Sequence, residues 1–169
     1  MKYEIAYISK SGNTERLAYG IADLLPHNET FVTNLATENI TRKADVYLIG
    51  FGVNKGTIPL SVMEALEDMS GKTLMFFVTS AMEPAVEYRA MVERKLCPFI
   101  PDECDYRGLF MCQGGFSDEM LKKIEIKLSE EPDNPSALKL LQAAELSAGH
   151  PDKTGCENAY RFILKNMVN

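Results

Sequence analysis

Residues 9–14 read Ser-Lys-Ser-Gly-Asn-Thr, and this loop joins an expected apolar strand (Tyr3–Ile8) to an expected amphipathic helix (Glu15–Leu25). Such a loop turns the first backbone N–H groups of the helix toward a common point. These unpaired donors and the positive end of the helix dipole favour an anion there. The three hydroxyl side chains add donors, and the glycine lets the backbone come close. The stretch predicts a phosphate-binding loop; an ordinary turn capped by Ser and Asn is the alternative.

The rest of the chain alternates between strands and helices. Apolar runs predict strands at Thr30–Asn34, Asp45–Phe51, Thr73–Thr79 and Arg107–Cys112, and helical spacing predicts helices at Ile58–Met69 and Pro84–Leu96. Near-continuous apolar strands separated by helices indicate a parallel sheet that is covered on both faces. We therefore expect one α/β domain over residues 1–169, with a five-stranded parallel sheet in the order 2-1-3-4-5. In that order the loops after strands one and three meet at the switch point of the sheet.

Two further loops follow strands that end near the phosphate loop. Residues 50–59 contain three glycines within seven residues, which indicates unusual backbone angles or close approach to a ligand. Residues 79–84 are small and polar at first, and the hydroxyls of Thr79 and Ser80 could donate to a ligand. Neither a Walker A motif nor a Gly-x-Gly-x-x-Gly motif is present, so a nucleotide triphosphate or a dinucleotide is not favoured. Plain turns without a ligand remain the alternative for both loops.

The Ser-x-Ser-Gly-Asn-Thr loop at the end of the first strand resembles the phosphate loop of the flavodoxin family, which binds FMN. The resemblance implies that the loops after strands three and four flank the flavin ring, and that a backbone carbonyl in residues 54–56 accepts a hydrogen bond from reduced flavin N5. It implies neither a catalytic side chain nor a metal ligand. The candidate FMN-binding residues are Ser9, Lys10, Ser11, Gly12, Asn13, Thr14, Val53, Asn54, Lys55, Gly56, Thr79, Ser80, Ala81 and Met82.

The sequence departs from the family pattern at the flavin ring. Flavodoxins commonly stack the ring between aromatic side chains, but this chain has no tryptophan and Val53 stands where the first aromatic would be. Phe51 and Met82 are the side chains we expect to pack on the ring instead. The layout Gly-Phe-x-Val-x-Lys-Gly-Thr, Cys-Gln-Gly and His-Pro-Asp is similar to a flavodoxin-like subgroup from anaerobic and gut bacteria, part of which is associated with bilin-reducing enzymes.

Composition favours a soluble cytoplasmic protein. Eighteen Lys and Arg against 24 Asp and Glu give a formal charge of −6 and a pI near 5.0, which argues against nucleic acid and suits a basic protein partner. No apolar run approaches the length of a membrane span, and the N-terminus lacks the layout of a signal peptide. The four cysteines form no Cys-x-x-Cys pair, which favours reduced thiols over a metal site.

The C-terminal part holds more helix than a minimal five-stranded domain needs. Ser117 is expected to cap a helix of about a dozen residues, followed by helices at Ser136–Leu146 and from about Lys153 to Val168. This extra helical segment before the last helix could dock a partner or cover the sheet edge, and its leucines are expected to belong to the core. His150 precedes the last helix; it is either a surface turn residue or a group close to the flavin.

Three functions remain open from the sequence. The first is an FMN electron carrier, a monomer or weak dimer, that serves a redox partner protein, with a reductase among the candidates. The second is an FMN-dependent reductase of a small substrate such as a quinone, with His150 or Tyr88 as contacts. The third is a cofactor-free module that binds other proteins through its acidic surface or its extra helices.

Overall fold

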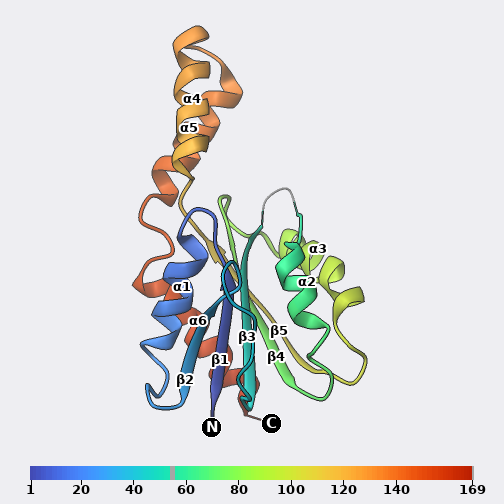
Figure 1. Cartoon of the computed structure of the whole chain (residues 1–169). Helices are drawn as coiled ribbons and strands as arrows, with labels where there is room; N and C mark the ends of the chain where they lie inside the picture. The colour runs from blue at the N-terminus through green and yellow to red at the C-terminus, as the bar shows by residue number, and fades with distance from the viewer. Residues whose placement is uncertain (54–55, 169) are drawn as a thin grey trace.

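The computed structural model describes residues 1–53 and 56–168, and its centre is a five-stranded parallel sheet (Figure 1). The strand order is β2-β1-β3-β4-β5, which confirms the predicted order 2-1-3-4-5. The strands are β1 (Tyr3–Ile8), β2 (Thr30–Asn34), β3 (Val46–Val53), β4 (Thr73–Ser80) and β5 (Asp105–Gln113). Because all strands run the same way, the loops that follow them gather at one edge of the sheet.

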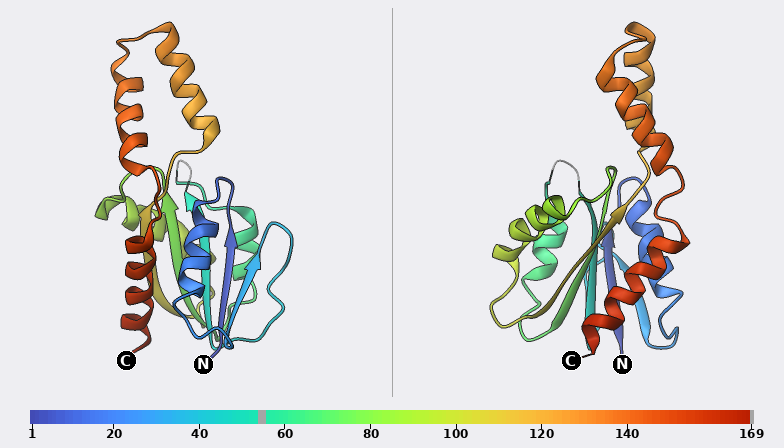
Figure 2. Two further views of the ribbon diagram at one scale, coloured as in Figure 1. Left: turned by 90° about the vertical axis from the view of Figure 1, so that its left-hand side faces the viewer. Right: turned by 180° about the vertical axis from the view of Figure 1, so that it is seen from behind.

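Helices cover both faces of the sheet, as predicted for a parallel sheet (Figures 1 and 2). Helices α1 (Asn13–Ala22) and α6 (Lys153–Met167) lie on one face, and α2 (Leu60–Leu66) and α3 (Val86–Leu96) lie on the other. A short 3₁₀ helix, η1 (Cys97–Phe99), follows α3. The remaining helices, α4 (Asp118–Glu130) and α5 (Pro135–Ser147), form the extra helical segment expected before the last helix.

The alternation of side chains along the strands divides the core into two clusters. Ile5 and Tyr7 of β1 point to the α1–α6 face, whereas the intervening Ala6 points to the α2–α3 face. Burying a large apolar side chain contributes roughly 1.5–3 kcal/mol to folding, so both faces contribute substantially to stability. The backbone of β1 and β3 is thereby held rigid, and the loops that follow these strands have a fixed starting point.

Several predicted helices differ from the structure at their ends. Helix α3 begins at Val86 rather than at the predicted Pro84, because Ala85 before it is extended. Helix α1 begins at Asn13, two residues before the predicted start, because Gly12 adopts a left-handed φ of 86° and lets the chain turn into the helix there. Helix α2 begins at Leu60 rather than Ile58, because Pro59 is extended and precedes the first helical residue. It ends at Leu66, short of the predicted Met69, although Met69 is buried in the core.

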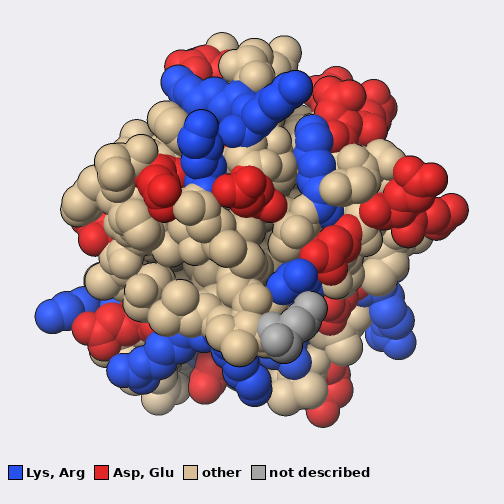
Figure 3. Space-filling model, turned by 90° about the horizontal axis from the view of Figure 1, so that it is seen from below, with Lys and Arg blue, Asp and Glu red and all other residues tan. Residues whose placement is uncertain are grey.

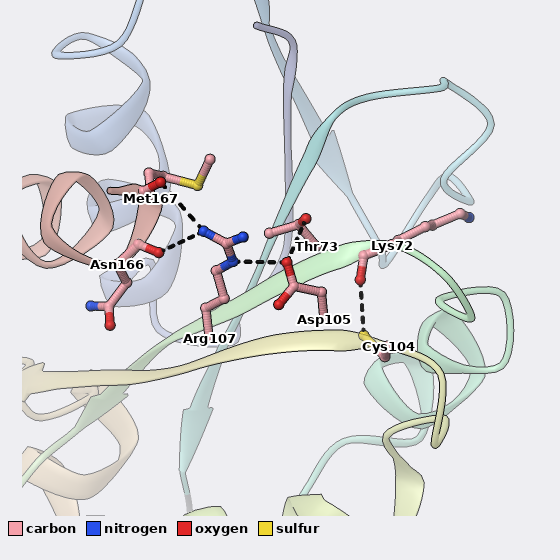
Figure 4. Close-up of polar contacts among 7 residues, drawn as sticks. All are labelled: Lys72, Thr73, Cys104, Asp105, Arg107, Asn166 and Met167. Atoms are coloured by element: carbon pink, nitrogen blue, oxygen red, sulfur yellow. Dashed lines mark hydrogen bonds and ion pairs between the residues drawn. The ribbon is translucent and has the colours of Figure 1, made fainter. Parts of the chain in front are cut away.

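Arg107 links the C-terminal end of α6 to β5, at the edge of the sheet opposite the predicted ligand loops (Figure 4). Its Nη1 donates to the carbonyl oxygens of Asn166 at 2.9 Å and Met167 at 3.4 Å, at the C-terminal end of α6. Its Nε donates to Asp105 Oδ2 at 2.8 Å, and the same oxygen accepts from Thr73 Oγ1 at 3.1 Å. The guanidinium thus satisfies helix carbonyls that would otherwise lack a partner and fixes α6 against β5.

Helices α4 and α5 form a hairpin that projects beyond the edge of the sheet at which the strands end (Figures 1 and 2). The prediction that its leucines belong to the core is wrong for Leu146, which is 71% exposed, whereas Leu140 and Leu141 are half-buried. The views show the hairpin rising away from the sheet instead of lying across its edge as a cover.

In the part of the chain that the structure describes, no helix has the length and apolar character to cross a membrane.

Candidate functional site

The loop predicted to bind phosphate (residues 9–14, called the phosphate loop below) joins β1 to α1 at the edge where the strands end. Gly12 is the residue that precedes α1, and its φ of 86° lies in the left-handed region that favours glycine. Space is not the reason for glycine, since a Cβ at this position would meet no atom within 4 Å. The loop therefore needs glycine for its backbone conformation, and it leaves open space beside that residue.

The hydroxyls of this loop accept hydrogen bonds and keep their own hydrogens. Ser9 Oγ accepts from the backbone N–H of Gly12 at 3.1 Å, and Ser11 Oγ accepts from Asn13 Nδ2 at 3.1 Å. Each serine hydroxyl has one hydrogen to donate, and neither hydrogen has an acceptor among the described residues. Two O–H donors thus remain for an external acceptor, which is the chemistry an anion needs.

The first turn of α1 adds backbone donors. Gly12 has no side chain to cap the helix, so the first N–H groups of α1 receive no side-chain oxygen, in contrast to α4, which Ser117 caps, and α6, which Asp152 caps. The acidic residue of this turn, Glu15, accepts a hydrogen bond from the Tyr7 hydroxyl at 2.6 Å. Burial and this carboxylate raise the pKa of Tyr7. The anion-attracting end of the helix is left open.

Thr14 and Thr79 connect the phosphate loop to the loop after β4. Both residues are buried, and their Oγ1 atoms are 2.9 Å apart. Because either oxygen can donate, one hydroxyl hydrogen stays free, and a nearby anion would favour the arrangement in which Thr14 keeps it. Gly52 at the end of β3 lies over this pair, since a Cβ there would be 3.5 Å from Thr14 Oγ1 and 3.4 Å from Thr79 Oγ1.

The loop after β3 is described only in part. Asn54 and Lys55 lie outside the described residues, so their predicted contacts with a flavin stay predictions. Val53 is half-buried at the end of β3, and the carbonyl of Gly56 accepts from Lys95 Nζ at 3.1 Å. The expectation that Phe51 packs on a flavin ring is wrong, because its side chain is completely buried on the α2–α3 face of the sheet.

The loop after β4 is held by hydrogen bonds of its own. The Ser80 hydroxyl donates to the carbonyl of Met82 at 2.7 Å, so its single hydrogen is already engaged and Ser80 is not the side-chain donor expected here. Gln113 Nε2 donates to the carbonyl of Ala81 at 3.2 Å, which ties the loop to the end of β5. Met82 is 47% exposed and free to pack on a ligand.

The residues that follow β5 also contact the phosphate loop. Asn13 Nδ2 donates to the carbonyl of Gly115 at 2.6 Å, across 102 residues of sequence. A Cβ on Gly114 would lie 2.8 Å from the Asn13 amide nitrogen, so the amide packs directly on this glycine. The glycines and the half-buried Phe116 that follows them were not predicted as site residues; the Gly-Gly pair directly after a strand was the available signal.

His150 lies at the same edge of the sheet as the phosphate loop, whereas Tyr88 is packed against the core. The backbone carbonyl of His150 accepts from the Gly115 N–H at 2.9 Å, and its side chain is 36% exposed with Nδ1 4.0 Å from Asp152 Oδ1. Tyr88 lies half-buried in α3 against the core of the α2–α3 face.

Burial and the nearby Cys156 raise the pKa of Cys112 to about 12, so this thiol stays protonated at neutral pH.

Comparison with known proteins identifies the family. A model of the flavodoxin domain matches residues 4–164. The chain belongs to the flavodoxin family. Its relatives include the flavodoxin-like domain-containing protein BilS of Clostridioides difficile (strain CD3), which is 29% identical over 99% of this chain and 97% of that protein. The BilS protein of Clostridium symbiosum (strain WAL-14163) is 23% identical over 99% of this chain and 96% of its own length. These matches confirm the resemblance to the flavodoxin family and extend it over nearly the whole chain.

Solved structures agree with the flavodoxin fold. A flavoprotein in complex with FMN from Lactobacillus acidophilus NCFM aligns with a TM-score of 0.53 at 17% identity, covering 72% of this chain and 97% of that one. A flavodoxin from Streptococcus pneumoniae TIGR4 aligns with a TM-score of 0.50 at 18% identity, covering 86% of this chain and 96% of that one. At these identities the likeness concerns the fold.

Proposed function

We propose that this flavodoxin-family protein binds FMN at the edge where its strands end and passes electrons to a redox partner protein. The observation that carries the proposal is the phosphate loop. Ser9 and Ser11 each accept a hydrogen bond within the loop and retain a free O–H donor, and both stand before the uncapped N-terminus of α1. A phosphate monoester would satisfy these donors and the helix dipole together.

The residues present fit FMN at its phosphate end and are unusual at its ring. Ser9, Ser11, the first N–H groups of α1 and the free hydrogen of the Thr14–Thr79 pair would hold the phosphate. Val53, the exposed Met82 and the backbone of the loops after β3 and β4 would face the ring. Since Val53 replaces a stacking aromatic, we expect a weaker contact with the ring than in flavodoxins that have one. The flavin, when bound, supplies the redox chemistry.

An electron carrier has to hold its cofactor in a fixed position and does not need a catalytic side chain. The loops after β4 and β5 are joined by hydrogen bonds, such as Gly114 N–H to the Ser80 carbonyl at 2.7 Å, so the ring would lie against a fixed part of this edge. Among residues 1–53 and 56–168, no cluster of three or more His, Cys, Asp or Glu side chains could hold a metal ion. The free cysteines suit the reducing cytoplasm, where we place the protein as a monomer or weak dimer.

The first test is the visible absorption spectrum of the purified protein, followed by FMN titration of the colourless apoprotein. We expect a flavin spectrum or uptake of one FMN per chain. Reduction of the bound flavin by a nicotinamide cofactor, with turnover of a quinone and no partner protein, would favour the reductase alternative. A colourless protein that ignores FMN would contradict both redox functions.

A further inference from the structure

We propose that the hairpin of α4 and α5 (residues 118–147, called the arm below) is the docking site for a redox protein that presents a basic face around its own cofactor. The proposal rests on the FMN function proposed above, because it names the surface by which the electron partner finds the flavin. It commits to a basic partner protein rather than a second copy of this chain.

The arm is anchored at the proposed flavin site. The segments that lead into and out of the arm are joined by the hydrogen bond from the Gly115 N–H to the His150 carbonyl at 2.9 Å. Asn13 of the phosphate loop donates to Gly115 at 2.6 Å, and Arg16 of α1 donates to the Gly149 carbonyl at 3.4 Å. These bonds hold the base of the arm beside the phosphate loop, while the helices extend past the edge of the sheet (Figure 2). A protein that binds the arm is therefore held at the flavin edge.

The arm leaves apolar side chains uncovered. Of its large apolar residues only Ile124 is buried, whereas Ile126 is 59% exposed and Leu138 is 45% exposed. A groove of about 310 Å³ runs between the helices; its lining includes Ile124, Ala137 and Leu140, and its charged residues are Lys123 and Lys127. Two helices that stand away from the domain cannot bury an apolar face by themselves, so this surface has the character of an interface.

Charge decides which kind of partner fits. The arm holds seven acidic and four basic residues, a formal charge of −3, which is half of the −6 carried by the whole chain. Two of its lysines are engaged with arm glutamates, Lys123 with Glu119 and Lys127 with Glu131, both at 2.7 Å. Two copies of an acidic arm repel one another, whereas a basic protein is attracted. On the face at the far end of the domain from the arm, which is seen from below in Figure 3, basic and acidic side chains are interspersed.

The probe is cytochrome c, a basic haem protein that accepts one electron as its iron goes from ferric to ferrous. Each two-electron-reduced FMN would reduce two molecules of it. The first readout needs no electron transfer: oxidised cytochrome c is added to isotope-labelled full-length protein, and amide chemical shifts are followed by NMR. We expect the shifts that change to concentrate in residues 118–147 and the loops at their base. Changes confined to the opposite face would overturn the proposal.

The second readout is the rate at which the reduced protein reduces cytochrome c. The arm variant Glu125→Lys/Glu130→Lys should slow this reaction by about tenfold or more at low ionic strength, and the loss should fade at high salt. The matched control Glu64→Lys/Glu67→Lys makes the same change of charge on exposed residues of α2 and its end. It should lower the rate much less. Ile126→Ser/Leu146→Ser should lower the rate at every salt concentration.

The outcomes separate this proposal from the function on which it rests. Reoxidation by dioxygen, a small neutral acceptor, should be the same in all variants, and a wild-type protein without flavin would contradict the proposed function itself. Equal rates for the arm variant and its control, in protein that holds FMN, would overturn the arm proposal alone. A wild-type dimer that Ile126→Ser/Leu146→Ser converts to monomers would overturn it as well, because the occupant would then be a second copy.

Discussion

Thr14 and Thr79 share a buried hydrogen bond, with their Oγ1 atoms 2.9 Å apart, although 65 residues separate them in the sequence. The bond joins the start of α1 to the end of β4 beneath the proposed phosphate position. Replacing one threonine by valine leaves the other hydroxyl buried without this partner, which typically costs about 1–3 kcal/mol. Replacing both removes both polar groups and should cost clearly less than the sum of the single changes.

Urea unfolding of the apoprotein for Thr14→Val, Thr79→Val and the double variant measures this coupling. Strictly additive losses of unfolding free energy would contradict a direct bond between the two hydroxyls.

The neighbouring glycines 114 and 115 offer a matched pair of substitutions. A Cβ on Gly114 would lie 2.8 Å from the Asn13 side-chain nitrogen, whereas a Cβ on Gly115 would meet its nearest atom at 3.6 Å, an ordinary contact. We expect Gly114→Ala to displace Asn13, lower the thermal midpoint and weaken FMN binding by about tenfold, on the order of 1.4 kcal/mol. Gly115→Ala should leave both nearly unchanged. Thermal unfolding and FMN titration of the two variants check this, and equal effects would show that Asn13 does not pack as described.

The strands could be predicted because they depend on local patterns, and their order 2-1-3-4-5 is the one that suits a ligand loop after the first strand of such a series. Phosphate binding at that loop stays a proposal. Apolar runs mark buried parallel strands, and the Ser-Lys-Ser-Gly-Asn-Thr stretch follows the first of them. The partners of individual side chains could not be predicted, since Asn13 meets Gly115 across 102 residues and Ser80 turns its hydroxyl to Met82 within its own loop. Periodicity also could not distinguish the leucines of the arm from core leucines, because a helix that projects from the domain has the same spacing as one packed on a sheet.

Glu4 should make stability depend on pH. Its side chain is fully buried in β1; Oε1 accepts a hydrogen bond from Thr33, and Oε2 has no hydrogen-bond partner among the described residues. Burial raises the pKa of Glu4, and this outweighs the hydrogen bond from Thr33 and the charge of Arg42, which both lower it. The unfolded chain therefore loses this proton at a lower pH than the native protein, so stability falls as pH rises from the ordinary value toward the raised one.

Glu4→Gln removes that titration and can still accept from Thr33. Relative to wild type, the variant should gain up to about 1.4 kcal/mol for each pH unit across this window. Denaturant unfolding between pH 4 and pH 8 measures the difference, with the exposed Glu125→Gln as the control. A difference between Glu4→Gln and wild type that stays constant over that range would contradict a raised pKa at Glu4.

The most direct measurement of the central claim compares the affinity of the apoprotein for FMN and for riboflavin, which lacks the phosphate. If Ser9, Ser11 and the start of α1 hold the phosphate, FMN should bind at least roughly a hundredfold more tightly, about 3 kcal/mol. Ser9→Ala/Ser11→Ala should remove most of that advantage and leave riboflavin binding unchanged. Equal affinity for the two flavins in the wild-type protein, or an FMN affinity that ignores the two serines, would contradict the phosphate loop described here.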